Sequence, residues 1–184
     1  MKGLFVGRKI KYDGTQLSSH FAYKNFKLAG DSIVAFIGPV EVKLDEMVDI
    51  EDVINKEPIY SDLMLNFIIE VFGFELKGLV ALQRLFVCII KETLEAMGKI
   101  KLSREGDDLF YDGRKLSVSI ATVSPVSGLI HTALNIRNTG CPIPVSCLDE
   151  FNIDVKDFTD KVIRNFTAEF EEICFASVKV DWVK

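Results

Sequence analysis

The sequence is poor in several residues on which common functions depend. Its 184 residues include one tryptophan, two histidines, four cysteines and five prolines. Two histidines are too few for most histidine-centred catalytic or metal sites. The chain also lacks the glycine-rich phosphate loop, the dinucleotide-binding fingerprint, the serine-nucleophile elbow and the zinc-protease helix motif. The common nucleotide hydrolases, dehydrogenases, serine hydrolases and zinc proteases are therefore not indicated.

Long apolar runs and excess positive charge are absent as well. No stretch reaches the roughly 18 consecutive apolar residues of a membrane span, because Asn66, Glu70 and Lys91 interrupt the longest runs. The amino terminus lacks the apolar core and cleavage site of a signal peptide. A net charge of −5 opposes salt-dependent capture of nucleic acid. We expect a cytoplasmic protein without membrane or nucleic-acid partners.

What is present is an ordinary globular composition, 48% hydrophobic and 27% charged. Its length predicts one domain over residues 1–184. The cysteines are expected to be reduced thiols. Only Cys141 and Cys147 lie close in sequence, and their C-x5-C spacing without a second pair does not predict a metal site.

The hydrophobic periodicity predicts an α+β fold with a mixed, mainly antiparallel sheet packed by three main helices. The expected helices begin at Thr15, Gly78 and Asp154, and glycines at 30 and 98 are expected to end the first two. The expected strands cover residues 3–11, 32–37, 40–44, 63–71, 99–102, 109–111, 116–123, 129–136 and 176–183.

The segment from Asp107 to Ile136 holds the residues with the clearest chemistry. Asp112-Gly113 predicts a tight hairpin turn. On the strand that leaves it, Lys115, Ser117 and Ser119 are expected to share one face, because alternate residues of a strand do. Leu116, Val118 and Ile120 are then expected to point into the core. A lysine beside two hydroxyls suits an anionic ligand, although a hairpin with a merely solvated polar face fits the same pattern.

This segment resembles the core of the biotin/lipoate protein ligase domain. There, an acidic residue, a short strand, a turn and a Lys-Ile-Ser/Ala-Gly run are followed by a strand that bears a histidine. Here Asp107-Asp108, the run Asp112–Ser117 and the run Ile130–Asn135 fall in the same order. The likeness covers roughly residues 14–173. The whole chain also resembles an uncharacterised archaeal family distantly related to these ligases.

The resemblance implies a fold like that of the class II aminoacyl-tRNA synthetases and a reaction on a small carboxylic acid through an acyl-adenylate. Lys115 would contact the acyl carboxylate and the α-phosphate, and Asp108 would face the adenylate through a metal or the ribose. His131 would line the acyl pocket or stiffen its strand. Ser117, Ser119 and Asn135 would complete the substrate-binding set, with ATP and magnesium as cofactors by resemblance only.

The chain departs from the ligase pattern where those enzymes hold phosphate. Their glycine-rich loop corresponds to Asp49–Tyr60, which has no glycine and a negative net charge. Val118 stands where glycine is usual, and Asp107 replaces the usual asparagine. These departures favour an alternative: a non-catalytic module that binds a small anion or acyl compound.

Two further hypotheses stay open. Related octanoyl transferases form a thioester on a cysteine, and Cys141 or Cys147 could serve that role, Cys147 from its position before a helical stretch at Leu148–Phe151. An oligomeric interaction protein is the other, because an apolar edge strand at Phe175–Trp182 could pair between copies.

Overall fold

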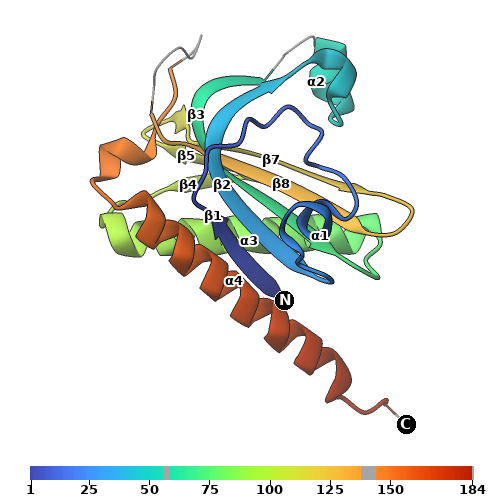
Figure 1. Ribbon diagram of the computed structural model, residues 1–184. Coiled ribbons are helices and arrows are strands. Elements are labelled where there is room, and N and C mark those ends of the chain that lie inside the picture. The colour runs from blue at the N-terminus through green and yellow to red at the C-terminus, as the bar shows by residue number, and fades with distance from the viewer. Residues whose placement is uncertain (56–58, 138–143, 184) are drawn as a thin grey trace.

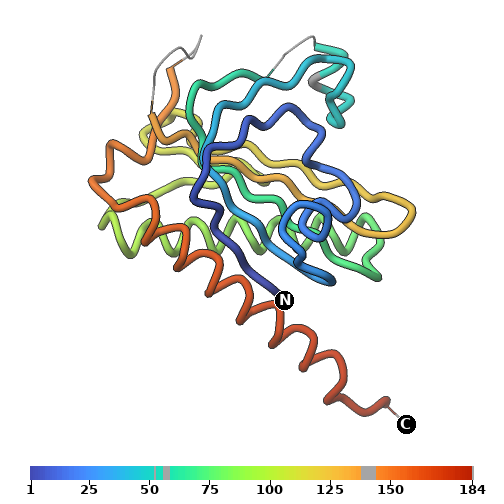
Figure 2. Tube along the Cα trace, in the orientation of Figure 1, coloured from blue at the N-terminus to red at the C-terminus, as the bar shows by residue number. Residues whose placement is uncertain are grey.

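The computed structural model describes residues 1–55, 59–137 and 144–183, and the chain forms the predicted α+β fold within them (Figures 1 and 2). The principal strands are β1 (Lys2–Val6), β2 (Ser32–Val42), β3 (Ile59–Val71), β7 (Ser117–Val123) and β8 (Gly128–Asn135). The helices are α1 (Phe21–Phe26), α2 (Ile50–Asn55), α3 (Leu76–Gly98) and α4 (Val155–Val178), with 3-10 turns η1 (Leu44–Glu46) and η2 (Leu148–Phe151). Three short strands, β4 (Ser103–Glu105), β5 (Asp108–Tyr111) and β6 (Arg114–Lys115), complete the set.

The principal strands form one sheet in the order β1-β2-β3-β8-β7. β1 runs parallel to β2, and the other neighbouring strands are antiparallel. The short strands form a separate antiparallel sheet in the order β4-β5-β6. The prediction of a mixed, mainly antiparallel sheet is therefore confirmed.

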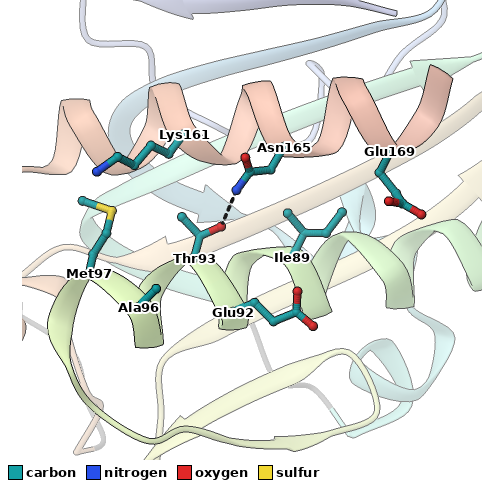
Figure 3. A pocket seen from close by; sticks show the side chains of 8 residues that line it. All are labelled: Ile89, Glu92, Thr93, Ala96, Met97, Lys161, Asn165 and Glu169. Atoms are coloured by element: carbon teal, nitrogen blue, oxygen red, sulfur yellow. Dashed lines mark hydrogen bonds between the residues drawn. The ribbon is translucent and has the colours of Figure 1, made fainter. Parts of the chain in front are cut away.

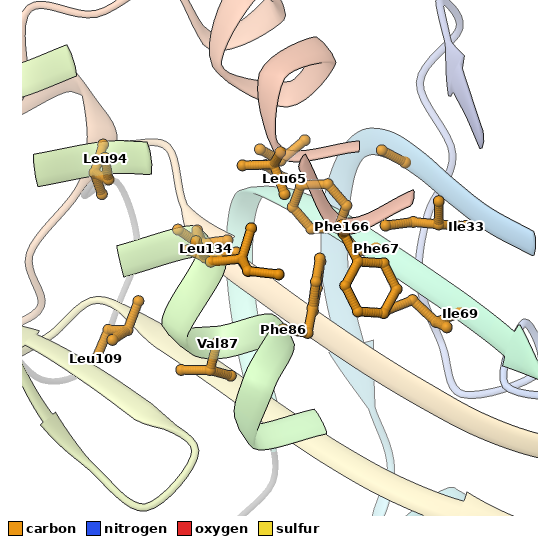
Figure 4. Close-up of a cluster of buried hydrophobic side chains, with 14 of the residues drawn as sticks. Ile33, Leu65, Phe67, Ile69, Phe86, Val87, Leu94, Leu109, Leu134 and Phe166 are labelled. Atoms are coloured by element: carbon orange, nitrogen blue, oxygen red, sulfur yellow. The ribbon is translucent and has the colours of Figure 1, made fainter. Parts of the chain in front are cut away.

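Helices α3 and α4 cover one face of the principal sheet (Figure 1). Phe86 of α3 joins the layers, because its ring centroid lies 5.3 Å from that of Phe67 on β3 and 4.7 Å from that of Phe166 on α4. All three rings are fully buried among aliphatic side chains of the sheet and helices (Figure 4). Removing one such ring typically costs about 3–5 kcal/mol of stability.

The opposite face of the sheet has a thinner cover. Because side chains alternate along a strand, this face also carries apolar residues, including Phe36 and Met64. The chain between Ile10 and Leu28, with the six-residue helix α1, packs over part of it. Tyr12 and Phe21 of that segment are buried in the same cluster. The rest of this face is open to the cavity described below.

The segment around Ile10 reaches β2 through an unusually close approach. An ideal Cβ built on Gly38 would lie 1.8 Å from the Ile10 carbonyl oxygen, so only glycine fits there. The Tyr12 N–H donates to the Pro39 carbonyl at 2.9 Å. Gly38-Pro39 is not the predicted turn between two strands: β2 is continuous, with a register shift between Gly38 and Val40. The shift accommodates Pro39, which has no N–H to offer the ladder.

Several predicted end and turn signals are confirmed. The Asp154 carboxylate accepts the Asp157 N–H at 2.7 Å and caps α4. Asp112 and Gly113 join β5 to β6 with φ of 52° and 73°, the left-handed values that such a turn requires. Helix α3 ends at Gly98 as predicted, although the residue in the left-handed conformation is Lys99.

Two local predictions are wrong because side chains replace regular backbone pairing. The helix expected from Thr15 is only α1, since the Asp13 carboxylate binds both the N–H and the hydroxyl of Thr15 and turns the chain there. The strand expected at residues 99–102 is absent. The Leu102 N–H donates instead to the Glu95 carboxylate at 2.7 Å, and β4 begins one residue later.

The prediction of a strand at residues 176–183 is also wrong. Helix α4 continues to Val178, and residues 179–183 form no regular element. The end of α4 extends past the edge of the sheet, so the alternating apolar residues at 176–183 have no neighbouring strand to pair with (Figure 1). We call Phe175–Val183 the C-terminal arm; Val178, Val180 and Trp182 in it are 72–77% exposed. None of the helices in the described ranges is long and apolar enough to cross a membrane.

Candidate functional site

A cavity of about 770 Å³ opens on the face of the sheet opposite α3 and α4. Its walls come from the N-terminal segment, the η1–α2 connection, the start of β3, the β5–β6 hairpin, and strands β7 and β8. Five of the six predicted site residues line it, namely Asp108, Lys115, Ser119, His131 and Asn135; Ser117 does not. The fold thus brings most of the predicted residues to one place.

Lys115 and Asp108 form an ion pair at the cavity wall. The Lys115 Nζ lies 2.8 Å from Asp108 Oδ2, and the two side chains are 41% and 28% exposed. The β5–turn–β6 hairpin creates this pair by placing the two strands side by side. Burial raises the pKa of the Asp108 carboxyl above its ordinary value, and the hydrogen bond from Lys115 opposes that rise. The lysine is half exposed and can meet a ligand from the cavity side.

Asp107 is held by helix α3. Its Oδ2 accepts a 2.8 Å hydrogen bond from Gln83 Nε2, and its Oδ1 lies 3.4 Å from an Arg84 guanidinium nitrogen. Gln83 is only 3% exposed and also donates to Ser119 Oγ at 3.0 Å. The Gln83 amide thus connects the cavity wall to helix α3 through hydrogen bonds. A glutamine within the apolar face of α3 was the sequence signal that could have revealed it.

The predicted common face of Lys115, Ser117 and Ser119 is not what the strand presents. The Ser117 hydroxyl is buried and accepts the Leu109 N–H at 2.9 Å. The Ser119 hydroxyl bonds Gln83 and the His131 carbonyl on the α3 side of the sheet. The strand is interrupted at Leu116, which is buried in the core between β6 and β7. Both hydroxyls are therefore engaged within the protein.

The interruption at Leu116 also affects the apolar residues that alternate with these serines, all of which were expected to point into the core. Leu116 does point into the core, as predicted. Val118 and Ile120 instead line the cavity. They are opposite Ala133 and His131 on β8, and these four residues share the cavity face of the sheet. The cavity floor is therefore mainly apolar.

His131 lies deep in the cavity and is neutral. It is 4% exposed, and burial lowers the pKa of its imidazole from 6.5 to about 3. Its Nε2 lies 3.0 Å from Asn66 Oδ1 on β3. The Tyr12 ring stacks on the imidazole with centroids 3.7 Å apart and planes 12° apart. Burial also raises the pKa of Tyr12, so its hydroxyl stays protonated.

Asn135 lies on β8, four residues after His131. It is 6% exposed and lines the cavity. Its Oδ1 accepts a long, 3.4 Å hydrogen bond from Ser61 Oγ. No residue that the structure describes accepts a hydrogen bond from its amide nitrogen. A buried amide donor on a cavity wall is suited to a carbonyl or carboxylate oxygen of a ligand.

Carboxylates surround the mouth of the cavity. Glu46, Asp49 and Glu51, which we call the acidic rim, come from η1, the connection after it and α2. Within the described ranges, no group of three histidine, cysteine or carboxylate side chains could hold a metal ion. The rim disfavours a second polyanion beside a ligand held at Lys115.

The cysteine hypothesis finds no geometry in its favour. Cys141 lies outside the described residues. Cys147 is 2% exposed, begins η2, and donates its N–H to Glu150 Oε1 at 2.8 Å. Its place before the predicted helical stretch is confirmed, but it does not line the cavity.

A second hollow, of about 540 Å³, lies between α3 and α4 (Figure 3). A 3.1 Å hydrogen bond from Asn165 to Thr93 crosses it. Glu92, Glu169 and Lys161 stand around it. It lies on the helix side of the molecule, away from every residue that the sequence singled out.

Comparison with solved structures shows that this architecture is that of the biotin and lipoate protein ligases. The biotin protein ligase of Aquifex aeolicus, solved with biotin and ATP, matches 93% of this chain and 71% of its own at a TM-score of 0.65 and 14% identity. Protein Ta0514 of T. acidophilum, named as a candidate lipoate protein ligase and solved with lipoic acid, matches 93% of this chain and 87% of its own at a TM-score of 0.61 and 14% identity. At such identities the likeness shows the fold alone.

Closer relatives define the family. The chain belongs to the family described as "Domain of unknown function (DUF366)", whose model matches residues 1–181. The "Uncharacterized protein MJ0805" of Methanocaldococcus jannaschii is 37% identical over an alignment of 182 residues, and the match covers 94% of this chain and 81% of that protein. A "Protein of Unknown Function" from Pyrococcus horikoshi matches the full length of both chains at a TM-score of 0.94 and 41% identity. The predicted archaeal, ligase-related family is confirmed.

Proposed function

We propose that this protein is a ligase- or acyltransferase-like protein that binds a small carboxylic acid in the cavity, with the ligand carboxylate at Lys115. The observation that carries the proposal is the half-exposed Lys115 ammonium on the wall of a 770 Å³ cavity. The Asn135 amide, with its unmatched donor, supports the same orientation of the ligand. An ammonium and an amide N–H together suit one carboxylate.

The proposed reaction is activation of that acid. A carboxylate oxygen attacks the α-phosphorus of ATP, the bond to the β-phosphate oxygen breaks, and pyrophosphate leaves. Lys115 then stabilises the negative charge that accumulates on the α-phosphate. Asp108 is assigned a positioning role toward the adenylate, because its carboxylate fixes Lys115 at 2.8 Å.

A second candidate function is ligand binding without catalysis. The acidic rim favours it, because Glu46, Asp49 and Glu51 oppose nucleotide phosphates at the cavity mouth. Asp107 and Asp108 are also engaged by Gln83, Arg84 and Lys115, so they do not form a ready site for magnesium. No step above is therefore assigned to a metal.

The assay for this proposal is thermal stability in the presence of carboxylic acids, with and without ATP and magnesium, followed by ATP–pyrophosphate exchange. A ligand that binds the native state raises its melting temperature by mass action. Lys115→Met removes the proposed carboxylate contact. Lys77→Met is the matched control, because Lys77 is exposed on α3, on the other face of the sheet.

The outcomes separate the two candidates. Exchange that is lost only in Lys115→Met supports activation of the acid. Binding of acids without exchange supports the binding module. Acid binding that Lys115→Met leaves unchanged contradicts both.

We also propose a cytoplasmic, single-domain protein that associates with copies of itself. The exposed apolar residues of the C-terminal arm support association, now through a helix end rather than the predicted edge strand. Light scattering of the wild type and of a variant ending at Cys174 tests it, and a monomer at all concentrations would contradict it.

A further inference from the structure

The hydrogen bonds around His131 fix which of its nitrogens carries the proton. Asn66 Nδ2 lies 3.2 Å from the Met64 carbonyl oxygen, so the amide NH₂ points that way and donates. Asn66 Oδ1 is then the atom that faces His131 Nε2, at 3.0 Å. An amide oxygen can only accept, so Nε2 carries the proton. The imidazole is neutral, which leaves Nδ1 with a free lone pair.

That lone pair has no partner among the residues that the structure describes. His131 is 4% exposed and lines the cavity, so the cavity is the route by which another molecule reaches it. The hydroxyl of the stacked Tyr12 is in the same situation: the residue is 4% exposed, lines the cavity, and makes no side-chain hydrogen bond to a described residue. Buried polar groups are normally satisfied. Neither atom is among the fully enclosed polar side-chain atoms that lack a partner, so both are open to the cavity and can pair with a ligand that fills it.

These groups lie far from the lysine end of the cavity. Asn135 and His131 are four residues apart on β8 and share the cavity face. At the rise of a strand they are separated by about 13 Å. Lys115 lies at the Asn135 end, since the Asn135 N–H donates to the Leu116 carbonyl next to it. A ligand whose carboxylate meets Lys115 therefore directs its tail toward His131 and Tyr12.

We infer that the ligand is a carboxylic acid whose tail carries a neutral hydrogen-bond donor, a hydroxyl or an amide N–H, that donates to His131 Nδ1. A plain alkyl tail would leave the lone pair unmet. A cationic tail is disfavoured because His131 and Tyr12 are both buried, and burying an ammonium without a paired carboxylate is costly. This inference rests on the proposed function and names its substrate class.

The test compares acids that differ only at the tail. Octanoate, decanoate and dodecanoate are titrated beside their ω-hydroxy, ω-methoxy and ω-amino forms by calorimetry. The methoxy group accepts but cannot donate. The ω-hydroxy acid of the fitting length is expected to bind about tenfold or more tightly than the plain and methoxy acids, since an unmet buried acceptor is destabilising. In His131→Phe, which keeps an aromatic ring beside Tyr12 but removes Nδ1, that preference is expected to vanish.

The proposed function and this inference fail in different ways. If plain acids bind as tightly as hydroxy acids, and Lys115→Met abolishes both, the inference is overturned and the proposed function stands. If the ω-amino acids bind best, a cationic tail replaces the neutral donor and the inference is again overturned. If none of the acids binds in a Lys115-dependent way, both are overturned.

A second measurement uses the wild-type fold. Nitrogen-15 NMR of the imidazoles distinguishes a protonated from an unprotonated ring nitrogen. His131 is expected to show Nε2 protonated and Nδ1 unprotonated, and Nδ1 alone is expected to shift when a hydroxy acid binds. The other histidine is assigned by His20→Asn, because asparagine tolerates the left-handed φ of 65° at that position. Protonation at Nδ1 in the free protein would overturn the inference.

Discussion

The contact between Gly38 and Ile10 yields the sharpest test of the fold beneath the cavity. In Gly38→Ala the new methyl carbon would begin 1.8 Å from the Ile10 carbonyl oxygen and 2.6 Å from its carbonyl carbon. Both are backbone atoms, so no side-chain rotation relieves the clash. The two segments must separate by about 1.5 Å to reach ordinary contact. The Ile10 N–H to Ile37 carbonyl hydrogen bond, 3.0 Å long, lies in the strained region.

The expected cost follows from that displacement. Overpacking a closely fitted site typically destabilises by about 1–3 kcal/mol, and a clash of backbone against backbone belongs at the upper end. For a chain of this length each kcal/mol lowers the melting temperature by roughly 2–4 °C. Because Ile10 and Tyr12 move together, the change should also weaken ligand binding in the cavity.

Gly7→Ala is the matched control. An added Cβ at Gly7 meets no atom within 4 Å, and neither Gly7 nor Gly38 has a positive φ. Alanine at such a site is expected to be neutral or to stabilise by up to about 1 kcal/mol through the unfolded chain. Urea denaturation followed by far-ultraviolet circular dichroism compares the two variants. Equal free energies of unfolding would refute the close approach of the N-terminal segment to β2.

Three further predictions concern the core, a helix cap and pH. Phe166→Ala should lower the free energy of unfolding by about 3–5 kcal/mol, whereas Phe175→Ala, at a 57% exposed position on the same helix, should have little effect; similar losses would contradict the assigned core. Asp154→Ala should cost about 0.5–2 kcal/mol through loss of the α4 cap, and Asp154→Asn should retain most of it; equal losses in urea melts would count against capping. The pKa of His131 is lowered to about 3, so between that value and its ordinary 6.5 the unfolded chain binds a proton that the folded chain does not, and stability rises with pH. That contribution to the free energy of unfolding is complete above about pH 6.5 and is lost as the pH falls toward 3, with a slope of up to about 1.4 kcal/mol per pH unit. The melting temperature of His131→Phe should therefore depend less on pH in this range than that of the wild type. Parallel curves would rule out the buried neutral imidazole.

The sequence predicted the elements whose signals are local. The turn at Asp112-Gly113, the cap at Asp154 and the apolar face of α3 each depend on residues within a few positions of one another. The long-range resemblance added the ligase fold, which periodicity alone could not supply. The three local features are confirmed because neighbouring residues, rather than distant contacts, determine them.

What the sequence could not show depended on contacts between distant segments. The alternation that predicted a strand at residues 176–183 was real, but no sheet edge was available to pair with it. The break at Leu116 reversed the faces of Ser117 and Ser119, and nothing in the local pattern marks it. Tyr12 became a cavity residue only through its pairing with β2, some thirty positions further along the chain. Long-range pairing therefore decides the site more than local pattern does.

The place of Trp182 has a spectroscopic consequence. It is the one tryptophan of the chain, and it is 77% exposed in the C-terminal arm. Its indole is in water whether or not Phe86 and Phe166 are packed together. Its fluorescence is therefore expected to change little when the core unfolds. The same residue would respond strongly if another surface covered the arm, with blue-shifted emission and less quenching by iodide. The protein thus carries a natural optical probe of association and is nearly silent, at that wavelength, about its own unfolding.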